Sequence, residues 1–303
     1  MPLGGHARFA GLAAKASLAM PPEGHAGFAG VAVVRDANAV SGFLVVNPQS
    51  GKGPEAEGLR DEAERRGVDT HLLGPDDDAA ELARAAPDVP LGVAGGDGSL
   101  AAVAEVAIER DLPFVVVPFG TRNHFARDLG LDRDDPLAAL AAFNGGVERN
   151  VDVGRVNRRL FLNNVSLGLY ASLVHRRERH RRRGEALARL KALGILLRRP
   201  GALGVSIDGR PVEARVVFVS NNHYKLDLFS IGERERLDEG LLHLYVAAGL
   251  LPRAWEERSG ERFKVDAQAG RLRAAVDGEP EELETPLRFE IEPAALRALV
   301  PPR

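Results

Sequence analysis

The sequence predicts an α/β protein with a doubly wound N-terminal domain and a mostly antiparallel, β-sandwich-like C-terminal domain. From Gly42 onward, short apolar runs alternate with helical patterns, and each change of period falls at a turn residue. After Gly145 the helical patterns give way to alternating apolar and polar residues, broken by Asp-Gly and other turn signals. The chain has 303 residues, 45% of them hydrophobic, which is enough for two cores of ordinary size.

The first domain is expected to contain four buried strands separated by helices. The strands are predicted at residues 42–47, 68–73, 91–94 and 114–117. The helices are predicted at residues 55–66, from a cap at 76–78 to residue 86, around the apolar positions 100–108, and from residue 134 or 135 to 145. Strands that are apolar on both faces are typical of a parallel sheet with helices on both sides.

The second domain is expected to consist of antiparallel strands. They are predicted within residues 147–156, 158–167, 203–222, 240–248, 270–280 and 286–293. The resulting division is a poorly ordered extension (1–40), a first domain (41–150) and a second domain (151–293), with residues 294–303 a candidate to return to the first. The cleft between the two domains is the expected place for an active site.

The composition points to a reducing compartment. The chain has no cysteine, which leaves neither a disulfide framework nor a thiolate metal site. No apolar run reaches the roughly 18 residues of a membrane span, and the N-terminal segment lacks the layout of a signal peptide. A cytoplasmic location is therefore expected, with peripheral attachment to a membrane left open.

A glycine-rich loop, GGDGS, follows the third predicted strand. Gly95, Gly96 and Gly98 leave backbone N–H groups free to approach an anion at the positive end of a helix. Asp97 lies among them, and phosphate oxygens repel a carboxylate unless a cation lies between them or the carboxylate caps the helix. Two interpretations stay open: a magnesium nucleotide site, or a tight turn with Asp97 or Ser99 as the N-cap.

Two further polar loops follow predicted strands at the same edge of the sheet. Residues 47–53, NPQSGKG, lack the spacing of a Walker loop, G-x-x-x-x-G-K-[ST]. In residues 118–131, PFGTRNHFARDLGL, Gly120 allows close approach, and Thr121 and Asn123 offer short neutral hydrogen-bonding groups. Three such loops at one edge favour a nucleotide-binding crevice over three independent turns.

These motifs occur in an order typical of a known family. NPQSG, GGDGS, PFGTRN with FAR, and VDGE at Val276–Glu279 resemble the motifs of the diacylglycerol kinase catalytic domain superfamily, which includes bacterial lipid kinases, ceramide kinases and sphingosine kinases. The GGDG element is also shared with NAD kinases and phosphofructokinases. The resemblance runs from about Ser41 to Pro302 and implies a kinase that uses ATP and Mg²⁺.

The resemblance also implies roles for individual residues. Asp277 corresponds to the catalytic base, a carboxylate that accepts the proton of the attacking hydroxyl. Without the resemblance, Asp277–Gly278 is a hairpin turn, as is the similar Asp208–Gly209. Asp97 and Glu239 are the candidate magnesium ligands. The implied ATP-binding residues are Asn47, Pro48, Gln49, Ser50, Gly51, Gly95, Gly96, Asp97, Gly98, Ser99, Gly120, Thr121 and Asn123.

The chain departs from the family pattern at three places. His124 stands where the family has an acidic residue after the asparagine of its G-T-x-N-D loop. Ala101 and Ala102 replace a polar pair after the GGDG element, and Glu239 in LDEGLL stands where an aspartate of the structural magnesium loop is expected. These changes bear on the auxiliary metal contacts and on the identity of the substrate.

Residues 175–199 form a strongly basic segment, with ten Lys or Arg against two Glu, a local charge of 10 - 2 = +8. Such a run is either a solvated helix face or a surface that contacts an anionic membrane. Nucleic acid is not expected as a partner, because the run has no interleaved aromatic residues and the remainder of the chain is acidic. The histidines lack the spacing of zinc ligands on a helix.

Three functions stay open. The first is an ATP-dependent kinase of a lipid hydroxyl, such as that of diacylglycerol, which meets its substrate at a membrane surface; a homodimer is left open. The second is a nucleotide-binding or membrane-binding regulator that has lost catalysis, motivated by His124, Ala101–Ala102 and Glu239. The third is a kinase of a soluble alcohol such as NAD or a sugar phosphate.

Overall fold

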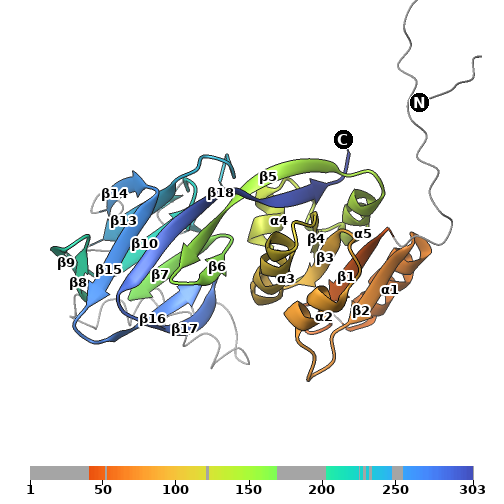
Figure 1. The fold of residues 1–303 in the computed structure, drawn as a ribbon, viewed down its shortest axis with the longest axis horizontal. Coiled ribbons are helices and arrows are strands. Elements are labelled where there is room, and N and C mark those ends of the chain that lie inside the picture. The colour runs from red at the N-terminus through yellow and green to blue at the C-terminus, as the bar shows by residue number, and fades with distance from the viewer. Residues whose placement is uncertain are drawn as a thin grey trace, which may run out of the picture. The chain divides into compact units, whose positions relative to one another are not determined.

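The computed structural model describes residues 41–51, 53–120, 123–168, 203–224, 226–227, 230–231, 234–247 and 255–302. They belong to one compact unit, Ala39–Arg303. Figure 1 shows that helices accompany the strands of its N-terminal half, whereas its C-terminal half is built from strands. The predicted extension 1–40, Thr121 and the basic segment 175–199 lie outside the described residues.

The N-terminal half is built on a parallel sheet in the order β2-β1-β3-β4. The four predicted strands are confirmed, and each pairs parallel with its neighbour in the sheet. The elements are β1 (Gly42–Val46), α1 (Gly53–Arg65), β2 (Val68–Leu72), α2 (Ala79–Ala85), β3 (Leu91–Gly95), α3 (Asp97–Glu109), β4 (Phe114–Pro118), α4 (His124–Asp128), α5 (Pro136–Ala139) and the 3-10 helix η1 (Leu140–Asn144).

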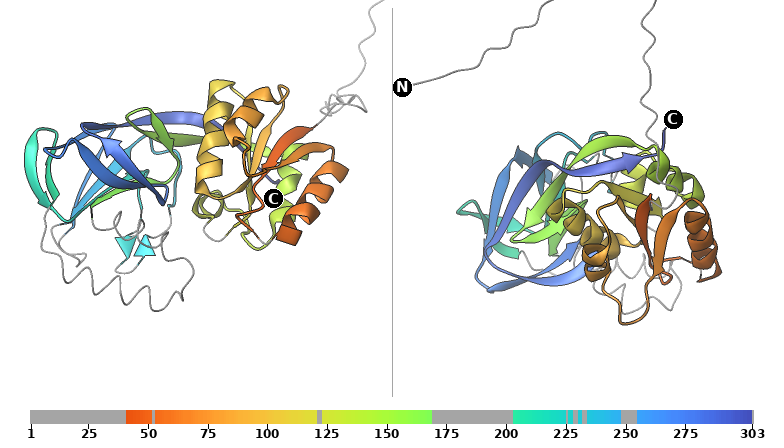
Figure 2. Two further views of the ribbon diagram at one scale, coloured as in Figure 1. Left: turned by 90° about the horizontal axis from the view of Figure 1, so that it is seen from below. Right: turned by 45° about the vertical axis from the view of Figure 1, so that its right-hand side comes forward.

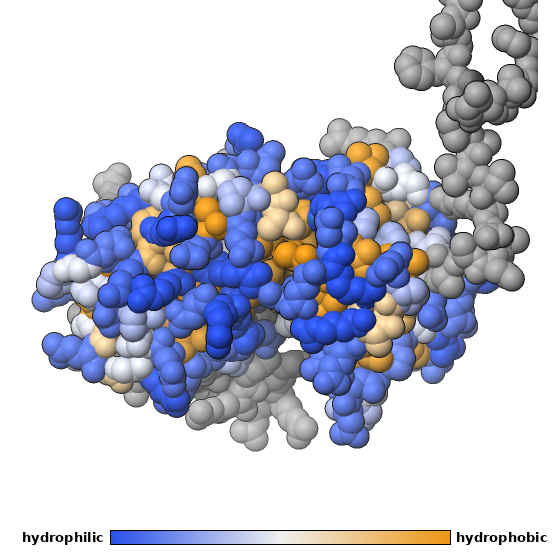
Figure 3. Space-filling model, in the orientation of Figure 1, coloured by the Kyte–Doolittle hydropathy of each residue, from blue (hydrophilic) through white to orange (hydrophobic). Residues whose placement is uncertain are grey.

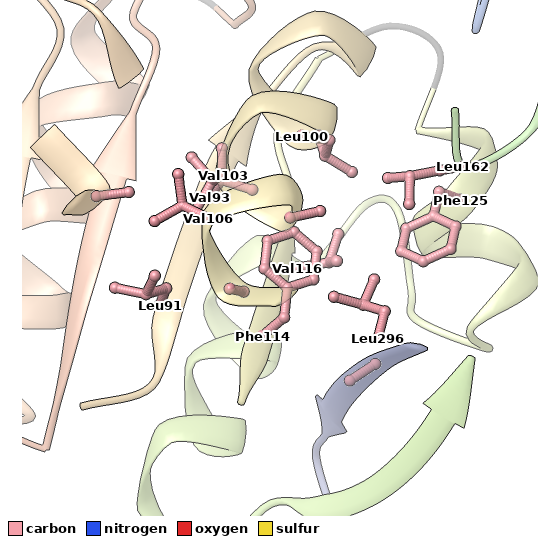
Figure 4. Close-up of a cluster of buried hydrophobic side chains, with 14 of the residues drawn as sticks. Leu91, Val93, Leu100, Val103, Val106, Phe114, Val116, Phe125, Leu162 and Leu296 are labelled. Atoms are coloured by element: carbon pink, nitrogen blue, oxygen red, sulfur yellow. The ribbon is translucent and has the colours of Figure 1, made fainter. Parts of the chain in front are cut away.

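Helices cover both faces of this sheet, because successive strand residues point to opposite sides. On one face, Val93 and Val116 pack in a core with residues of α2 and α3. On the other face, Leu44 packs with residues of α1, α5 and η1. Figure 4 shows part of the first core, where side chains of β3, β4 and α3 lie near Phe125 of α4 and Leu296 of the last strand. The predicted doubly wound arrangement is confirmed.

Helix caps follow the sequence signals in two of the helices. Asp78 is the N-cap of α2, and its carboxylate accepts hydrogen bonds from the N–H groups of Ala80 and Glu81. Asp135 caps α5 by accepting from Ala138 N–H at 3.0 Å, with a proline in the first turn. The predicted helix from residue 134 or 135 to 145 is therefore present, but its second part is a 3-10 helix.

Two long strands, β5 (Val147–Val156) and β18 (Leu287–Val300), run antiparallel to each other and connect the two halves. Ala298 and Leu299 near the end of β18 pair parallel with Phe114 and Val115 of β4. The last strand of the chain therefore extends the N-terminal sheet. Figures 1 and 2 show β5 and β18 side by side between the helical and the all-strand regions.

The C-terminal half is a sandwich of two antiparallel layers. One layer has the order β14-β13-β10-β7-β16-β17, and the other continues from β18 through β15 and β8 to β9. Both layers contribute side chains to one core between them. The remaining strands are β6 (Arg159–Phe161), β7 (Asn164–Gly168), β8 (Leu203–Ile207), β9 (Arg210–Ala214), β10 (Val216–Asn221), β11 (Leu226–Asp227), β12 (Ser230–Ile231), β13 (Leu242–Ala247), β14 (Trp255–Gly260), β15 (Arg262–Ala267), β16 (Arg271–Val276) and β17 (Glu279–Glu284).

The sequence reasoning missed β14 and β15, which follow each other in a charged stretch of the chain and belong to different layers. In β15, only Phe263 and Val265 are buried apolar residues, and they alternate with exposed Arg262 and Lys264. Two apolar positions are too short a pattern to stand out from the surrounding charges. Pairing with β18 and β8 on either side supplies the context that forms this strand.

The face shown in Figure 3 is mostly hydrophilic, with apolar residues in smaller groups among the charged ones. Among the residues that the structure describes, no helix has the length and apolar character needed to cross a membrane.

Candidate functional site

The structure brings together the loops that follow β1, β3 and β4. Asn47 donates a hydrogen bond from Nδ2 to Oγ of Ser99 at 3.3 Å. Ser50 Oγ accepts a hydrogen bond from Gly96 N–H at 2.9 Å. A Cβ at Gly120 would lie 3.2 Å from the carbonyl oxygen of Ser50, so the third loop also approaches the first closely. The three loops form one surface at the carboxyl edge of the sheet, where ligands of such sheets bind.

The loop after β4 requires a glycine at its centre. Gly120 has a φ of 138°, a conformation that residues with a side chain rarely adopt. Asn123 is buried, and its Nδ2 donates to the carbonyl of Gly120 at 3.0 Å. This bond ties the residue before α4 to Gly120, two residues after the end of β4. Thr121 lies outside the described residues, so its predicted contact with a nucleotide stays a prediction.

The N-terminus of α3 opens onto the same surface. Gly96 is the N-cap and makes no side-chain capping bond, so the interpretation of Asp97 or Ser99 as the N-cap is wrong. The cap comes instead from a distant loop, because Ser50 takes the hydrogen bond of Gly96 N–H. Asp97 lies in the first helical turn and is 8% exposed. The helix dipole stabilises negative charge at this place, whether from Asp97 or from a bound phosphate.

A pocket of about 320 Å³ lies at this edge. Its volume falls at the lower end of the range of small-molecule sites. The sequence reasoning missed one of its walls, the loop between β2 and α2. The available signal was topological, since this loop also follows a parallel strand and so reaches the same edge. The lining residues are Asn47, Gln49, Leu73, Gly74, Pro75, Asp77, Asp78, Ala79, Gly98, Ser99 and Ala102.

Asp77 organises the loop between β2 and α2. Its Oδ2 accepts the N–H of Gly74 at 2.8 Å and lies 2.7 Å from Nε2 of His71. The hydrogen bond with His71, followed by that with Gly74, lowers the pKa of Asp77. An ionised carboxylate therefore holds the backbone of the pocket wall.

Asp277 lies in the tight turn between β16 and β17, and it is 6% exposed. Its carboxylate accepts three backbone N–H bonds, from Leu162 at 2.8 Å, Asn163 at 2.7 Å and Asn164 at 2.9 Å. Burial raises the pKa of Asp277, while these three donors and the charge of Arg234 oppose the rise. The side chain named as the catalytic base is thus held rigidly by the turn between β6 and β7.

Glu279, two residues later, faces the glycine-rich loop. A Cβ at Gly98 would lie 3.9 Å from Cγ of Glu279. The VDGE motif therefore contributes two carboxylates with different surroundings: Asp277 is enclosed by backbone donors, and Glu279 lies against the loop predicted to hold phosphate. The sequence reasoning quoted Glu279 within its motif but gave it no role.

Glu239, a predicted magnesium ligand, interacts with two histidines. Its Oε2 accepts the backbone N–H of His223 at 2.9 Å and lies 3.2 Å from Nε2 of His243. On the other side of the His243 ring, Nδ1 lies 2.9 Å from Oε1 of Glu257. Within the described part of the chain, no group of three or more His, Cys, Asp or Glu side chains is arranged to hold a metal ion. The metal role of Glu239 stays a prediction.

Two of the three departures from the family pattern, at His124 and at Ala101–Ala102, follow strands that end at this edge of the sheet. His124 is the first residue of α4, directly after Asn123. Ala102 lines the pocket, whereas Ala101 packs against the core behind it. An apolar methyl group therefore forms part of the pocket wall at a position where the resemblance predicts a polar side chain.

Comparison with known proteins confirms the family resemblance. Residues 41–156 match the model of the diacylglycerol kinase catalytic domain. The chain is 37% identical over 84 residues to a diacylglycerol kinase of Bacillus subtilis (strain 168), which covers 27% of this chain and 28% of that protein. It is 35% identical over 121 residues to a diacylglycerol kinase of Mycobacterium tuberculosis (strain CDC 1551 / Oshkosh), which covers 37% of this chain and 39% of that protein.

The likeness in fold extends further than these alignments. A crystal structure of a diacylglycerol kinase from Bacillus anthracis str. Sterne superposes with a TM-score of 0.63 and 19% sequence identity, over 86% of this chain and 97% of the other. The sequence alignments with the two curated relatives span well under half of their lengths. The match to the family model, residues 41–156, covers the N-terminal half and β5.

Proposed function

We propose that this protein transfers the γ-phosphoryl group of ATP to the hydroxyl group of a lipid such as diacylglycerol, because residues 41–156 match the model of the diacylglycerol kinase catalytic domain. The main supporting observation is the meeting of three polar, glycine-bearing loops with the N-terminus of α3 at one sheet edge. Phosphoryl transfer asks a protein chiefly for positioning and charge stabilisation, and backbone N–H groups at a helix end supply both.

In this proposal, the phosphates lie on the Gly95–Ser99 loop and the rest of the nucleotide occupies the pocket. Asn47 and Ser99, bonded to each other, fix two of the lining loops, and the loop between β2 and α2 forms the opposite wall. Ser50 ties the first loop to the helix end, so the backbone that faces the phosphates is set before the nucleotide binds.

The predicted Mg²⁺ fits this site on the nucleotide rather than in a cage of protein ligands. Magnesium is commonly held by one or two carboxylates together with substrate phosphates, and Asp97 is the carboxylate in the first turn of α3. When bound there, the ion would neutralise charge on the phosphates. Asp97 would also be shielded from them, which resolves the repulsion expected from its place in the loop.

Asp277 is proposed as the general base. The lipid hydroxyl loses its proton to the Asp277 carboxylate as its oxygen forms a bond to the γ-phosphorus, and the bond from that phosphorus to the bridging oxygen of ADP breaks. Burial raises the pKa of this carboxyl, which makes it a stronger base than a solvated aspartate. Oδ2 keeps acceptor capacity beyond its one N–H bond, because a carboxylate has about four lone-pair sites, whereas Oδ1 already accepts two N–H bonds.

A second candidate function is a nucleotide-binding regulator without catalysis. One observation favours it: the carboxylate of Asp277 already serves three backbone donors and is almost completely buried. These contacts would also suit a purely structural aspartate. The membrane-surface substrate, the cytoplasmic location and the homodimer stay predictions.

Transfer of radiolabelled phosphate separates these functions. Purified full-length protein is incubated with labelled ATP and Mg²⁺ together with diacylglycerol or a sphingoid alcohol in mixed micelles, or with NAD or a sugar phosphate in solution. We expect label in the lipid fraction. Label only in a soluble acceptor would replace the lipid proposal with the third function. An ATP-induced thermal shift without any labelled acceptor would favour the regulator.

The nucleotide site can be tested independently of the acceptor. Gly120→Ala introduces a Cβ 3.2 Å from the Ser50 carbonyl and should reduce ATP affinity about tenfold or more by displacing the loop. Gly130→Ala is the matched control, because Gly130 also has a positive φ, 83°, but a Cβ added there would meet nothing within 4 Å. Isothermal titration with ATP and Mg²⁺ should show weaker binding only in the first variant; equal affinities would place the nucleotide elsewhere.

A further inference from the structure

Arg234 is a guanidinium buried where the two halves of the unit meet, with a side chain that is 0% exposed. Its Nε donates to Oδ2 of Asp128, the last residue of α4, at 2.7 Å. The rings of Phe125 and Tyr224 lie 5.9 and 5.2 Å from its Cζ. A buried arginine is tolerated when its donors are well paired. The acceptors of its other N–H groups therefore show which segments Arg234 holds.

The other donors of Arg234 reach the turn between β6 and β7. Nη1 donates to the carbonyl of Leu162 at 2.7 Å and also to the carbonyl of Asn221 in β10 at 3.2 Å, and Nη2 donates to Oδ1 of Asn163 at 2.8 Å. The N–H groups of these same two residues are donors to the carboxylate of Asp277. Arg234 therefore hydrogen-bonds the same two residues, 162 and 163, whose N–H groups hold the carboxylate of Asp277.

Asp128 links Arg234 to the predicted nucleotide loop. α4 begins directly after Asn123, so Asp128 lies five residues beyond the loop that carries Gly120. The Asp128 carboxylate is 0% exposed and also accepts a bond from Arg127 at 3.0 Å. A continuous chain of hydrogen bonds thus runs from α4 through Arg234 and residues 162–163 to Asp277.

We propose that Arg234 is a positioning residue that couples the loop and helix at 118–128 to Asp277 by holding residues 162 and 163 in place. This inference rests on the proposed function, since it names what aligns the base with the nucleotide loop. Arg234 acts only through other residues. The planar fork of the guanidinium is essential to this role, because one compact ammonium group cannot reach Asp128, Leu162 and Asn163 together in the same geometry.

Arg234→Lys separates charge from geometry. Lysine keeps a cation next to Asp128 but loses the fork to residues 162 and 163. We expect the N–H groups of residues 162–164 in the ATP-free protein to exchange about tenfold faster with solvent deuterium. We also expect kcat to fall about tenfold, with the KM for ATP within about threefold of wild type. Arg236→Lys is the matched control, because Arg236 lies two residues away, is exposed and pairs with Asp238.

The outcomes distinguish this inference from the proposed function. Wild-type exchange at residues 162–164 in the lysine variant would overturn it, because a cation alone would then suffice; faster exchange with an unchanged kcat would overturn it as well. If the lysine variant does not fold, the double variant Arg234→Met/Asp128→Leu is used instead, because it removes both buried charges. Hydrogen exchange at residues 162–164 and kcat are then measured for the double variant, with the same expected results. If the wild type phosphorylates no acceptor, the proposed function fails, while the exchange rates of the ATP-free protein still decide whether Arg234 holds the segment.

Discussion

The chain contains two Asp-Gly turns that are nearly identical in local structure and opposite in surroundings. Asp208 and Asp277 have φ values of 52° and 48°, and the following glycines have values of 80° and 86°. Asp208 is exposed and accepts one backbone N–H, from Lys264 in a neighbouring strand, at 2.8 Å. Asp277 is buried and accepts three backbone N–H groups from residues 162–164.

The difference shows that local sequence determines the turn, whereas tertiary packing determines the chemistry of its aspartate. Both aspartates tolerate positive φ and precede a glycine, so both form the turn of a hairpin. The second hairpin places its aspartate against the turn between β6 and β7, and Arg234 hydrogen-bonds the residues whose N–H groups donate to that aspartate. Tertiary packing therefore turns one of two equivalent turns into a candidate catalytic site.

The largest expected difference between the turns is in activity. Asp277→Asn removes the base and should lower kcat at least about 100-fold, because general base catalysis contributes on that scale or more. Asp208→Asn should leave kcat unchanged. Phosphate transfer to the lipid acceptor is the measurement, with ATP binding monitored in both variants. Comparable kcat values for the two variants would show that Asp277 is a structural residue like Asp208.

The same pair of variants should differ in stability. In Asp277→Asn the amide Nδ2 faces a backbone N–H, so at least one buried donor loses its acceptor, and the free energy of unfolding should fall by about 2–3 kcal/mol. In Asp208→Asn water can replace the lost contact, and the change should stay within about 0.5 kcal/mol. Urea denaturation of both proteins provides the values. An Asp277→Asn protein as stable as wild type would contradict the three-donor arrangement.

The pH dependence should separate the turns further. Because burial raises the pKa of Asp277, the folded protein binds more protons than the unfolded chain between the unfolded pKa, about 3.9, and the folded one. The contribution of Asp277 to the free energy of unfolding should therefore decrease as the pH rises through this window. Activity should rise through the same window, because the base must be ionised.

Two measurements test whether the pKa of Asp277 is raised. The acidic limb of kcat/KM should lie above the pKa of an ordinary aspartate, and Arg234→Gln should move it to higher pH, because the charge of Arg234 opposes the rise. Arg236→Gln, at an exposed arginine, is the control that should not move it. A limb at an ordinary aspartate pKa in the wild type would mean that another group controls the rate.

The sequence predicted correctly those features of the protein that depend on local residue patterns. The strands of the N-terminal sheet, the caps at Asp78 and Asp135 and the turn at Asp208 follow from residue type and spacing. The loops around Gly96 and Gly120 could be placed at one edge because parallel strands end together.

The rest depended on contacts between distant residues. Gly96 N–H donates to Ser50, 46 residues away, whereas the sequence offered only the nearby Asp97 or Ser99 as the N-cap in one of its two interpretations. Arg234 could not be singled out among the many arginines of the chain, since its role arises from Asp128 and Asn163, 106 and 71 residues distant. Sequence spacing carries no signal for pairings of this kind.

The smallest expected contrast concerns the two glycines. Gly209 and Gly278 both adopt a positive φ, so alanine should destabilise the fold by about 1 kcal/mol at either position. The effect on activity should differ, because a shift at Gly278 moves Asp277 on one side and Glu279 on the other, whereas Gly209 adjoins no site residue. We expect Gly278→Ala to lower kcat several-fold and Gly209→Ala to leave it unchanged, when both are assayed at a temperature where each is fully folded. Equal kcat values for the two variants would mean that activity does not depend on the accurate placement of Asp277 and Glu279 by the second turn.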